Sequence, residues 1–145
     1  MSKKIDAGGK MPEMNLTLVG GGTAKIGGPR DGWQMLVVYR GVHCPKRKQF
    51  MAKLDGLKDG FAEANTEIVC VSADSEDQAT RDKSEQGIDL PVACGLTEDQ
   101  MRALGLYISA LRSEQETDHN FPEPGLFVVN PSGQVQIVDI SNAPF

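Results

Sequence analysis

The sequence predicts an α/β domain in which helices cover both faces of a central mixed β-sheet. Two apolar runs, "WQMLVVYR" at 33–40 and "TEIVCVSAD" at 66–74, have the length and composition of buried strands. A stretch of helical character follows each run, and the chain ends in two strand-like segments joined by a short turn. Because strand–helix–strand crossovers make parallel pairs and the terminal hairpin is antiparallel, we expect the sheet to be mixed.

Length and composition favour one domain spanning residues 1–145. A chain of 145 residues buries roughly two-thirds of the surface that its unfolded form exposes. The composition is 39% hydrophobic and 24% charged, and the net charge of −5 gives no bulk attraction to nucleic acid or anionic membranes, so neither is expected as a partner. The sequence shows no apolar stretch of membrane-spanning length and no secretion signal at its start, which predicts a cytoplasmic protein.

Glycine-rich stretches and helical spacing define the first half of the chain. "LVGGGTAK" and "IGGPRDG" lie between short apolar runs and predict the turns of an N-terminal β-hairpin. After the first long strand, Pro45 suits the first position of a helix, where a backbone N–H would have no intrahelical partner. Four apolar residues then recur at helical spacing and predict the buried face of this helix: Phe50, Leu54, Leu57 and Phe61.

Capping signals and a turn motif define the second half. Ser75 with Gln78, and Thr97 with Gln100, have the spacing of capping boxes and predict two further helices. "LPVAC" lies between them and predicts a short strand. Residues 109–123 are polar and without a clear period, which predicts a loop. The segment "PGLFVVNPSGQVQIVDIS" predicts a hairpin whose turn is "NPSG".

Cys44 is the candidate reactive thiol. It lies in "YRGVHCPKRK", between the C-terminal end of a central strand and a helix N-terminus, where open α/β sheets usually place their sites. The N–H groups of the helix start, together with Arg40 and Arg47, favour the thiolate, and His43 is expected to tune the local field. In the alternative reading, Cys44 is a small apolar filler and the basic residues form a solvated helix face.

The remaining cysteines and histidines carry weaker signals. Cys70 lies within a predicted strand core, which indicates inert packing, and nothing beside Cys94 in the sequence activates a thiolate. His119 is interpreted as a lone surface histidine. Three cysteines cannot all pair within one chain, which agrees with a reducing compartment. No metal-ligand spacing, nucleophile elbow or dinucleotide motif is present, so no metal or cofactor is expected.

Several segments resemble the alkyl hydroperoxide reductase/thiol-specific antioxidant family, the peroxiredoxin-like branch of the thioredoxin-fold superfamily. They are "LVVYRGVHCPKRK", "IVCVSADSEDQA", "EPGLFVVNPSGQVQIVDIS" and, at the N-terminal hairpin, "AGGKMPEMNLTLVGGG". The resemblance spans nearly the whole chain. It implies a thioredoxin-like three-layer α/β/α sandwich with Cys44 in the place of the family's reactive cysteine.

The resemblance also implies which neighbours the cysteine should have. True peroxiredoxins place Thr or Ser three residues before it and Arg just before the strand that reads here as "GLFVVN", whereas this chain has Gly41 and Pro124. Thioredoxin-like relatives have a cis proline at the position of Pro124, beside which a disulfide substrate binds. We therefore expect Pro45, Pro124 and Gly125 to contribute to the substrate site.

The missing second cysteine determines the expected chemistry. Thioredoxin-like relatives carry CxxC, but the second position here is Arg47, which cannot release a mixed disulfide. Resolution would need Cys94, glutathione or the thiol of another protein. The sequence thus predicts a redox protein that reduces peroxides or disulfides through one cysteine at a CPxR site, using an external reductant such as glutathione or a thioredoxin-like protein. The alternative is a non-catalytic binding module with this fold, and a homodimer is compatible with either.

Overall fold

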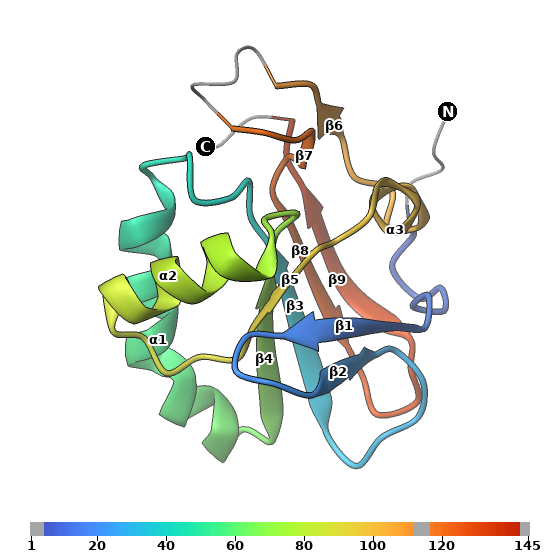
Figure 1. Cartoon of the computed structure of the whole chain (residues 1–145). Helices are drawn as coiled ribbons and strands as arrows, with labels where there is room; N and C mark the ends of the chain where they lie inside the picture. The colour runs from blue at the N-terminus through green and yellow to red at the C-terminus, as the bar shows by residue number, and fades with distance from the viewer. Residues whose placement is uncertain (1–4, 112–116, 143–145) are drawn as a thin grey trace.

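A computed structural model describes residues 5–111 and 117–142 (Figure 1). Its elements in chain order are β1 (Met14–Leu18), β2 (Thr23–Ile26), β3 (Trp33–Val38), α1 (Arg47–Glu63), β4 (Thr66–Val71), α2 (Glu76–Gln86), β5 (Val92–Cys94), α3 (Glu98–Ala103), β6 (Ile108–Ser109), β7 (Phe121–Pro122), β8 (Gly125–Val129) and β9 (Val135–Ile140). Seven strands form one sheet in the order β2-β1-β5-β4-β3-β8-β9, and β6 pairs with β7 separately. The fold is the predicted thioredoxin-like α/β sandwich.

The sheet is mixed, as predicted, and β3 lies next to its centre. β3 runs parallel to β4, with Val38 opposite Val71, and antiparallel to β8, with Val38 opposite Gly125. The C-terminal ends of β3 and β4 therefore lie beside the start of β8. This end of the strands is called the sheet edge below. The candidate cysteine follows β3 at this same edge.

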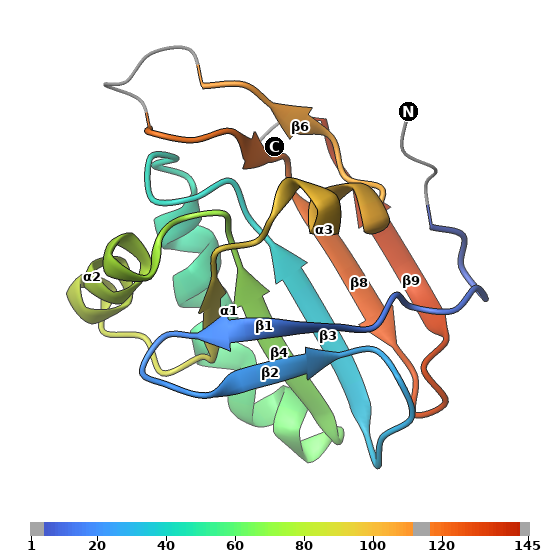
Figure 2. The ribbon, with the colours of Figure 1, turned by 45° about the vertical axis from the view of Figure 1, so that its right-hand side comes forward.

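Helices cover the two faces of the sheet, and the sheet curls so that its β1–β2 hairpin also packs over one face (Figure 2). On one face, Met51 and Leu54 of α1 pack in a cluster with Met35 and Ile68. On the other face, a cluster joins α3 and the hairpin to the sheet, with members that include Leu16, Ile26, Leu36, Val69, Met101 and Leu104. Figure 2 shows α1 behind the sheet and α3 in front of it. No helix in the described ranges is long and apolar enough to cross a membrane.

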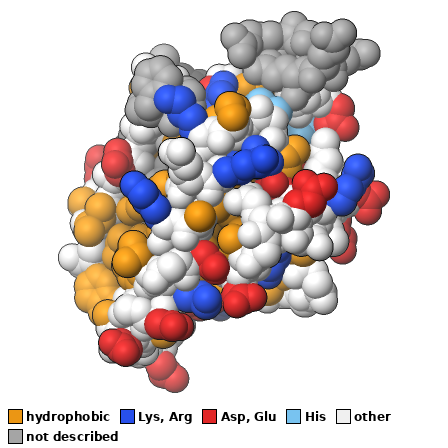
Figure 3. Space-filling view, turned by 90° about the vertical axis from the view of Figure 1, so that its left-hand side faces the viewer, with side chains coloured by type: hydrophobic (Ala, Val, Ile, Leu, Met, Phe, Trp, Pro, Cys, Tyr) orange, Lys and Arg blue, Asp and Glu red, His pale blue; other side chains and the backbone are white. Residues whose placement is uncertain are grey.

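The start and the buried face of α1 differ from the prediction. Pro45 precedes the helix, whose N-cap is Lys46 and whose first residue is Arg47. Met51 and Leu54 form the buried face, while Phe50 and Leu57 are 42% and 56% exposed. Figure 3 shows hydrophobic side chains at the surface on the side of α1. Leu54 and Phe61 of the predicted face pack against the core as expected, whereas Met51 is buried in the place predicted for Phe50.

The predicted caps are present, whereas the segment 109–123, predicted as a loop, contains strand residues. Capping boxes begin α2 at Ser75 and α3 at Thr97, and α2 ends at Gly87 in the left-handed conformation. Two short strands, β6 and β7, pair in the predicted loop and bury Phe121. Residues 112–116 of that loop lie outside the described residues. Pairing of two residues with two residues leaves no periodic signal in a sequence.

Cys70 is packed in the core, and we expect it to make the protein sensitive to alkaline pH. Burial raises the pKa of the Cys70 thiol from 9.0 to about 12. Because this pKa is higher in the folded state, its contribution to stability is complete below pH 9 and is lost as pH rises toward 12. Between about pH 9 and pH 11 the loss should reach roughly 2 kcal/mol.

Urea unfolding across this pH range, with the Cys70→Ala variant as comparison, measures the effect. The variant should be less stable at neutral pH because a small cavity forms, yet its stability should fall less between about pH 9 and pH 11. Burial also raises the pKa of Tyr39, whose contribution remains in both proteins. Parallel pH profiles for the two proteins would contradict the prediction.

Candidate active site

Cys44 lies in a loop that connects β3 to α1, here called the Cys44 loop (residues 39–46). Its N–H donates a hydrogen bond to the carbonyl of Gly41 at 3.1 Å. Its own carbonyl accepts from the N–H of Arg47 at 3.3 Å and from Nη1 of the same residue at 2.9 Å. These bonds fix the backbone of Cys44 directly before the first turn of α1. The N-cap residue, Lys46, makes no side-chain capping bond to α1 in the described structure, so the first-turn N–H groups other than that of Arg47 keep their capacity to donate.

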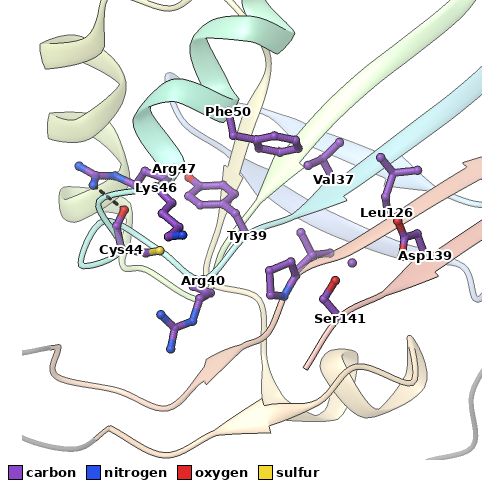
Figure 4. A pocket seen from close by; sticks show the side chains of 13 residues that line it. Val37, Tyr39, Arg40, Cys44, Lys46, Arg47, Phe50, Leu126, Asp139 and Ser141 are labelled. Atoms are coloured by element: carbon purple, nitrogen blue, oxygen red, sulfur yellow. Dashed lines mark hydrogen bonds between the residues drawn. The ribbon is translucent and has the colours of Figure 1, made fainter. Parts of the chain in front are cut away.

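The Cys44 side chain lines a pocket of about 240 Å³ at the sheet edge. Only 6% of Cys44 is exposed, and Figure 4 shows its sulfur directed away from the loop backbone, toward the other pocket residues. The lining residues from the Cys44 loop and α1 are Tyr39, Arg40, Cys44, Lys46, Arg47 and Phe50. The strands add Val37, Val38, Pro124, Gly125, Leu126, Asp139 and Ser141. The predicted Arg40, Arg47, Pro124 and Gly125 thus lie together with Cys44, whereas Pro45 and His43 are outside the lining.

Arg47 does not direct its charge at the sulfur. Its Nη2 is 2.7 Å from Oδ1 of Asp82, and its Nε donates to both carboxylate oxygens at 3.2 and 3.3 Å. Both side chains are nearly buried, with 10% and 6% exposed. Arg47 therefore joins α2 to the Cys44 carbonyl. The sequence analysis missed Asp82, since a pairing across 35 residues has no local signal.

Arg40 and His43 hold the β6–β7 ribbon against the Cys44 loop. The guanidinium of Arg40 lies over the ring of Phe121, 4.7 Å from its centroid, and its Nε is 2.9 Å from Oε1 of Glu123. The other oxygen of Glu123 accepts from the hydroxyl of Ser109 at 2.5 Å. The His43 ring packs on the same Phe121 ring at 4.4 Å. Glu123 and Phe121 are site residues that the sequence analysis missed.

A second polar contact joins the residues after β4 to the segment before β7. Nε2 of His119 is 3.3 Å from Oδ1 of Asp74, which is fully buried at the end of β4. His119 is therefore not the lone surface histidine that was predicted. Among the described residues, no group of three or more potential ligands is placed to hold a metal ion.

Comparison with known proteins identifies the family. The family model described as "AhpC/TSA family" matches residues 7–138. The chain belongs to the AhpC/TSA family. This membership agrees with the resemblance drawn from the motifs and supports a thiol-based peroxidase function. A search of curated proteins found no match.

Several solved structures that superpose on this chain are peroxiredoxins or peroxiredoxin-like proteins. A peroxiredoxin-like protein from Aquifex aeolicus superposes with a TM-score of 0.83 at 17% identity, covering 98% of this chain and 80% of the other. A mutant PrxQ from Xylella fastidiosa has a TM-score of 0.76 at 17% identity, covering 94% and 86%. The bacterioferritin comigratory protein of Xanthomonas campestris has a TM-score of 0.73 at 22% identity, covering 92% and 87%.

Two features of this AhpC/TSA chain depart from the expected arrangement. Gly41 has a φ of +132°, and a Cβ at this position would lie 2.7 Å from Oδ1 of Asp74. The loop as folded thus has no room for the threonine or serine of true peroxiredoxins. The described residues contain no cis peptide bond, so Pro124 lacks the cis geometry that the thioredoxin-like resemblance implied.

Cys94 is not directed at Cys44 in this AhpC/TSA structure. It lies on β5, which is separated from β3 by β4, so the two strands are about 10 Å apart. Its sulfur faces the carbonyl of Thr17 at 3.7 Å, on β1, the neighbour of β5 on the side away from β3. Burial raises the pKa of the Cys94 thiol, and the charges of Glu76 and Asp74 add to this effect. All three cysteines are free.

Proposed function

We propose that the protein reduces peroxides or disulfides through Cys44 alone and that a thiol from outside the chain restores it. The observation that carries this proposal is the position of the Cys44 sulfur at the wall of a pocket, next to the start of a long helix. Three free cysteines agree with work in a reducing compartment such as the cytoplasm. Membership of the AhpC/TSA family supports the same chemistry.

The reaction proceeds in three steps. The Cys44 thiolate attacks one oxygen of a peroxide, the O–O bond breaks, and an alcohol or water leaves with a proton while Cys44 becomes a sulfenic acid. The sulfur of an external thiol then attacks the Cys44 sulfur, and water leaves. The product is a mixed disulfide between Cys44 and the external thiol. A second external thiol displaces Cys44, so that two thiols are oxidised to one disulfide for each peroxide reduced. With a disulfide substrate, the first step forms the mixed disulfide directly.

The external thiol is required by the placement of the cysteines. CPxR has Arg47 where a dithiol reductase has its second cysteine, and Cys94 faces away on another strand. Glutathione or a thioredoxin-like protein would supply the electrons.

Each neighbour of Cys44 has a role in this proposal. The first turn of α1 stabilises the thiolate through its N–H groups, and Arg47 holds the Cys44 carbonyl in place at that turn. Arg40, from the Cys44 loop, lines the pocket and brings a positive charge to it, although its Nε is paired with Glu123. Pro124 and Gly125 form the opposite wall, where the substrate binds, and Pro45 keeps a backbone donor out of the turn. His43 contributes to the local field from its position on the ring of Phe121.

A second candidate function is a non-catalytic binding module. It is favoured by the pairing of both guanidinium groups with carboxylates, Arg40 with Glu123 and Arg47 with Asp82. Paired cations stabilise a nearby anion less than free ones do. Gly41 adds to this reading because it provides no hydroxyl group to polarise a peroxide.

Steady-state peroxide consumption separates the two functions. The purified protein is mixed with hydrogen peroxide or an organic hydroperoxide, and glutathione or a thioredoxin-like reductant is supplied in excess. Consumption that requires both the protein and the thiol is expected. Consumption no faster than with the thiol alone, for every reductant tried, would leave the binding module as the function.

A further inference from the structure

Asp74 is a buried carboxylate beside the Cys44 loop. It follows β4, at the sheet edge where β3 ends, and its exposed fraction is 0%. Burial raises the pKa of this carboxyl group above its usual value of 3.8. Burying a carboxylate is costly unless it is well hydrogen-bonded, so its contacts indicate what it holds in place.

The contacts of Asp74 converge on three segments. Its Oδ2 accepts the N–H of Val42 at 2.9 Å, within the Cys44 loop. The same oxygen accepts the hydroxyl of Ser72 at 2.9 Å, and this hydroxyl in turn accepts the Asp74 N–H at 3.2 Å. Its Oδ1 faces Nε2 of His119 at 3.3 Å, from the segment before β7. Ser72 thus orients the carboxylate. One carboxylate oxygen contacts the Cys44 loop, and the other contacts the segment before β7.

Gly41 completes the contact between Asp74 and the loop. The space in which a Cβ of residue 41 would lie is already filled, since all three carboxylate atoms of Asp74 are within 3.2 Å of it. Val42 and Gly41 are held by Asp74, and the Gly41 carbonyl accepts the N–H of Cys44. Two hydrogen bonds and one packing contact therefore connect the carboxylate to the backbone of the reactive cysteine.

We propose that Asp74 is a positioning residue for Cys44. It holds the turn from Gly41 to Cys44 so that the sulfur stays at the pocket wall, and it takes the place that the threonine of true peroxiredoxins would need. It does not touch the substrate. The catalytic consequence rests on the proposed peroxide reduction, whereas the effect on the loop does not.

The test compares Asp74→Ala with Asp74→Asn. Asparagine retains an oxygen that accepts the Val42 N–H, whereas alanine removes both the hydrogen bond and the contact with Gly41. We expect Asp74→Ala to slow the oxidation of Cys44 by peroxide in a single turnover by about tenfold or more, because small displacements of a reacting group cost much of the rate. Asp74→Asn should stay within about threefold of the wild-type rate. Alkylation of Cys44 by iodoacetamide should not slow in Asp74→Ala, since a looser loop exposes the sulfur.

Asp55→Ala is the matched control. Its carboxylate accepts the N–H groups of Asp89 and Leu90 and fixes a different loop. It should lower stability in urea without changing the oxidation rate of Cys44. Oxidation of Asp74→Ala at the wild-type rate, or equal slowing in Asp74→Ala and Asp55→Ala, would overturn the proposal.

Amide hydrogen exchange keeps this proposal separate from the proposed function. We expect faster exchange at Val42 and Cys44 in Asp74→Ala, and unchanged exchange there in Asp55→Ala. This result is expected even if the wild-type protein reduces no peroxide. Unchanged exchange at both amides in Asp74→Ala would overturn the positioning role whether or not the protein is a peroxidase.

Discussion

Cys44→Ser should lower thiol-dependent peroxide consumption by at least about 10³-fold, because the serine hydroxyl cannot replace a thiolate as the nucleophile. The change replaces a thiol with a hydroxyl of similar size, and the backbone bonds of residue 44 to Gly41 and Arg47 remain. The variant should therefore fold normally. Peroxide consumption measured with excess glutathione, together with circular dichroism, checks both expectations.

Cys94→Ser is the control for this prediction, and it also decides how Cys44 is restored. Cys94 lies on β5 with its sulfur toward Thr17, so its loss should change turnover by less than about threefold when the external thiol is in excess. A fall in turnover as large as that of Cys44→Ser would show that Cys94 resolves Cys44 after a rearrangement of β5. Unchanged turnover in Cys44→Ser itself would remove the redox assignment.

Arg47→Met should destabilise the protein by about 3–5 kcal/mol, the largest stability effect that we expect from a single substitution in the site. Methionine fills similar space but leaves the Asp82 carboxylate buried, and among the residues that the structure describes only Gln86 remains as a side-chain donor to it, at 3.0 Å. It also removes the bond from Nη1 to the Cys44 carbonyl. Urea unfolding at neutral pH measures the loss.

Two comparisons show whether the cost arises from the buried pair. The double variant Arg47→Met/Asp82→Leu should be more stable than the sum of the single changes predicts, because no unpaired charge is left. Arg102→Met breaks exposed pairs with Glu98 and Asp99 and should cost less than about 1 kcal/mol. Similar losses for Arg47→Met and Arg102→Met would contradict a structural role for the buried pair.

Local signals in the sequence were sufficient for most of the fold. Capping boxes at Ser75 and Thr97 depend on residues three apart, and both are present in the structure. The apolar runs became β3 and β4 because their residues are buried on both faces. The burial of α1 was predicted less well: a period fixes the spacing of a stripe, but the sheet decides which flank is covered, and Phe50 and Leu57 stay partly exposed.

The sequence could predict where the candidate site lies, but not which side chains contact one another there. The position of Cys44 between a strand and a helix, with Arg40, Arg47, Pro124 and Gly125 around one pocket, followed from topology and family resemblance. The acidic partners of these groups could not be predicted in this way. Glu123, Asp82 and Asp74 are far from Cys44 in the chain, and each meets its cation or N–H group only after folding. They change the electrostatics of the site, because the two arginines are paired rather than directed at the sulfur.

The central claim is that Cys44 is the cysteine that reacts. Mass spectrometry of the intact protein and of its peptides, after one equivalent of peroxide with and without glutathione, tests this most directly. The account predicts one added oxygen at Cys44 without glutathione and one glutathione adduct at Cys44 when glutathione is present. An unmodified Cys44, with oxidation at Cys94 or at no cysteine, would contradict it.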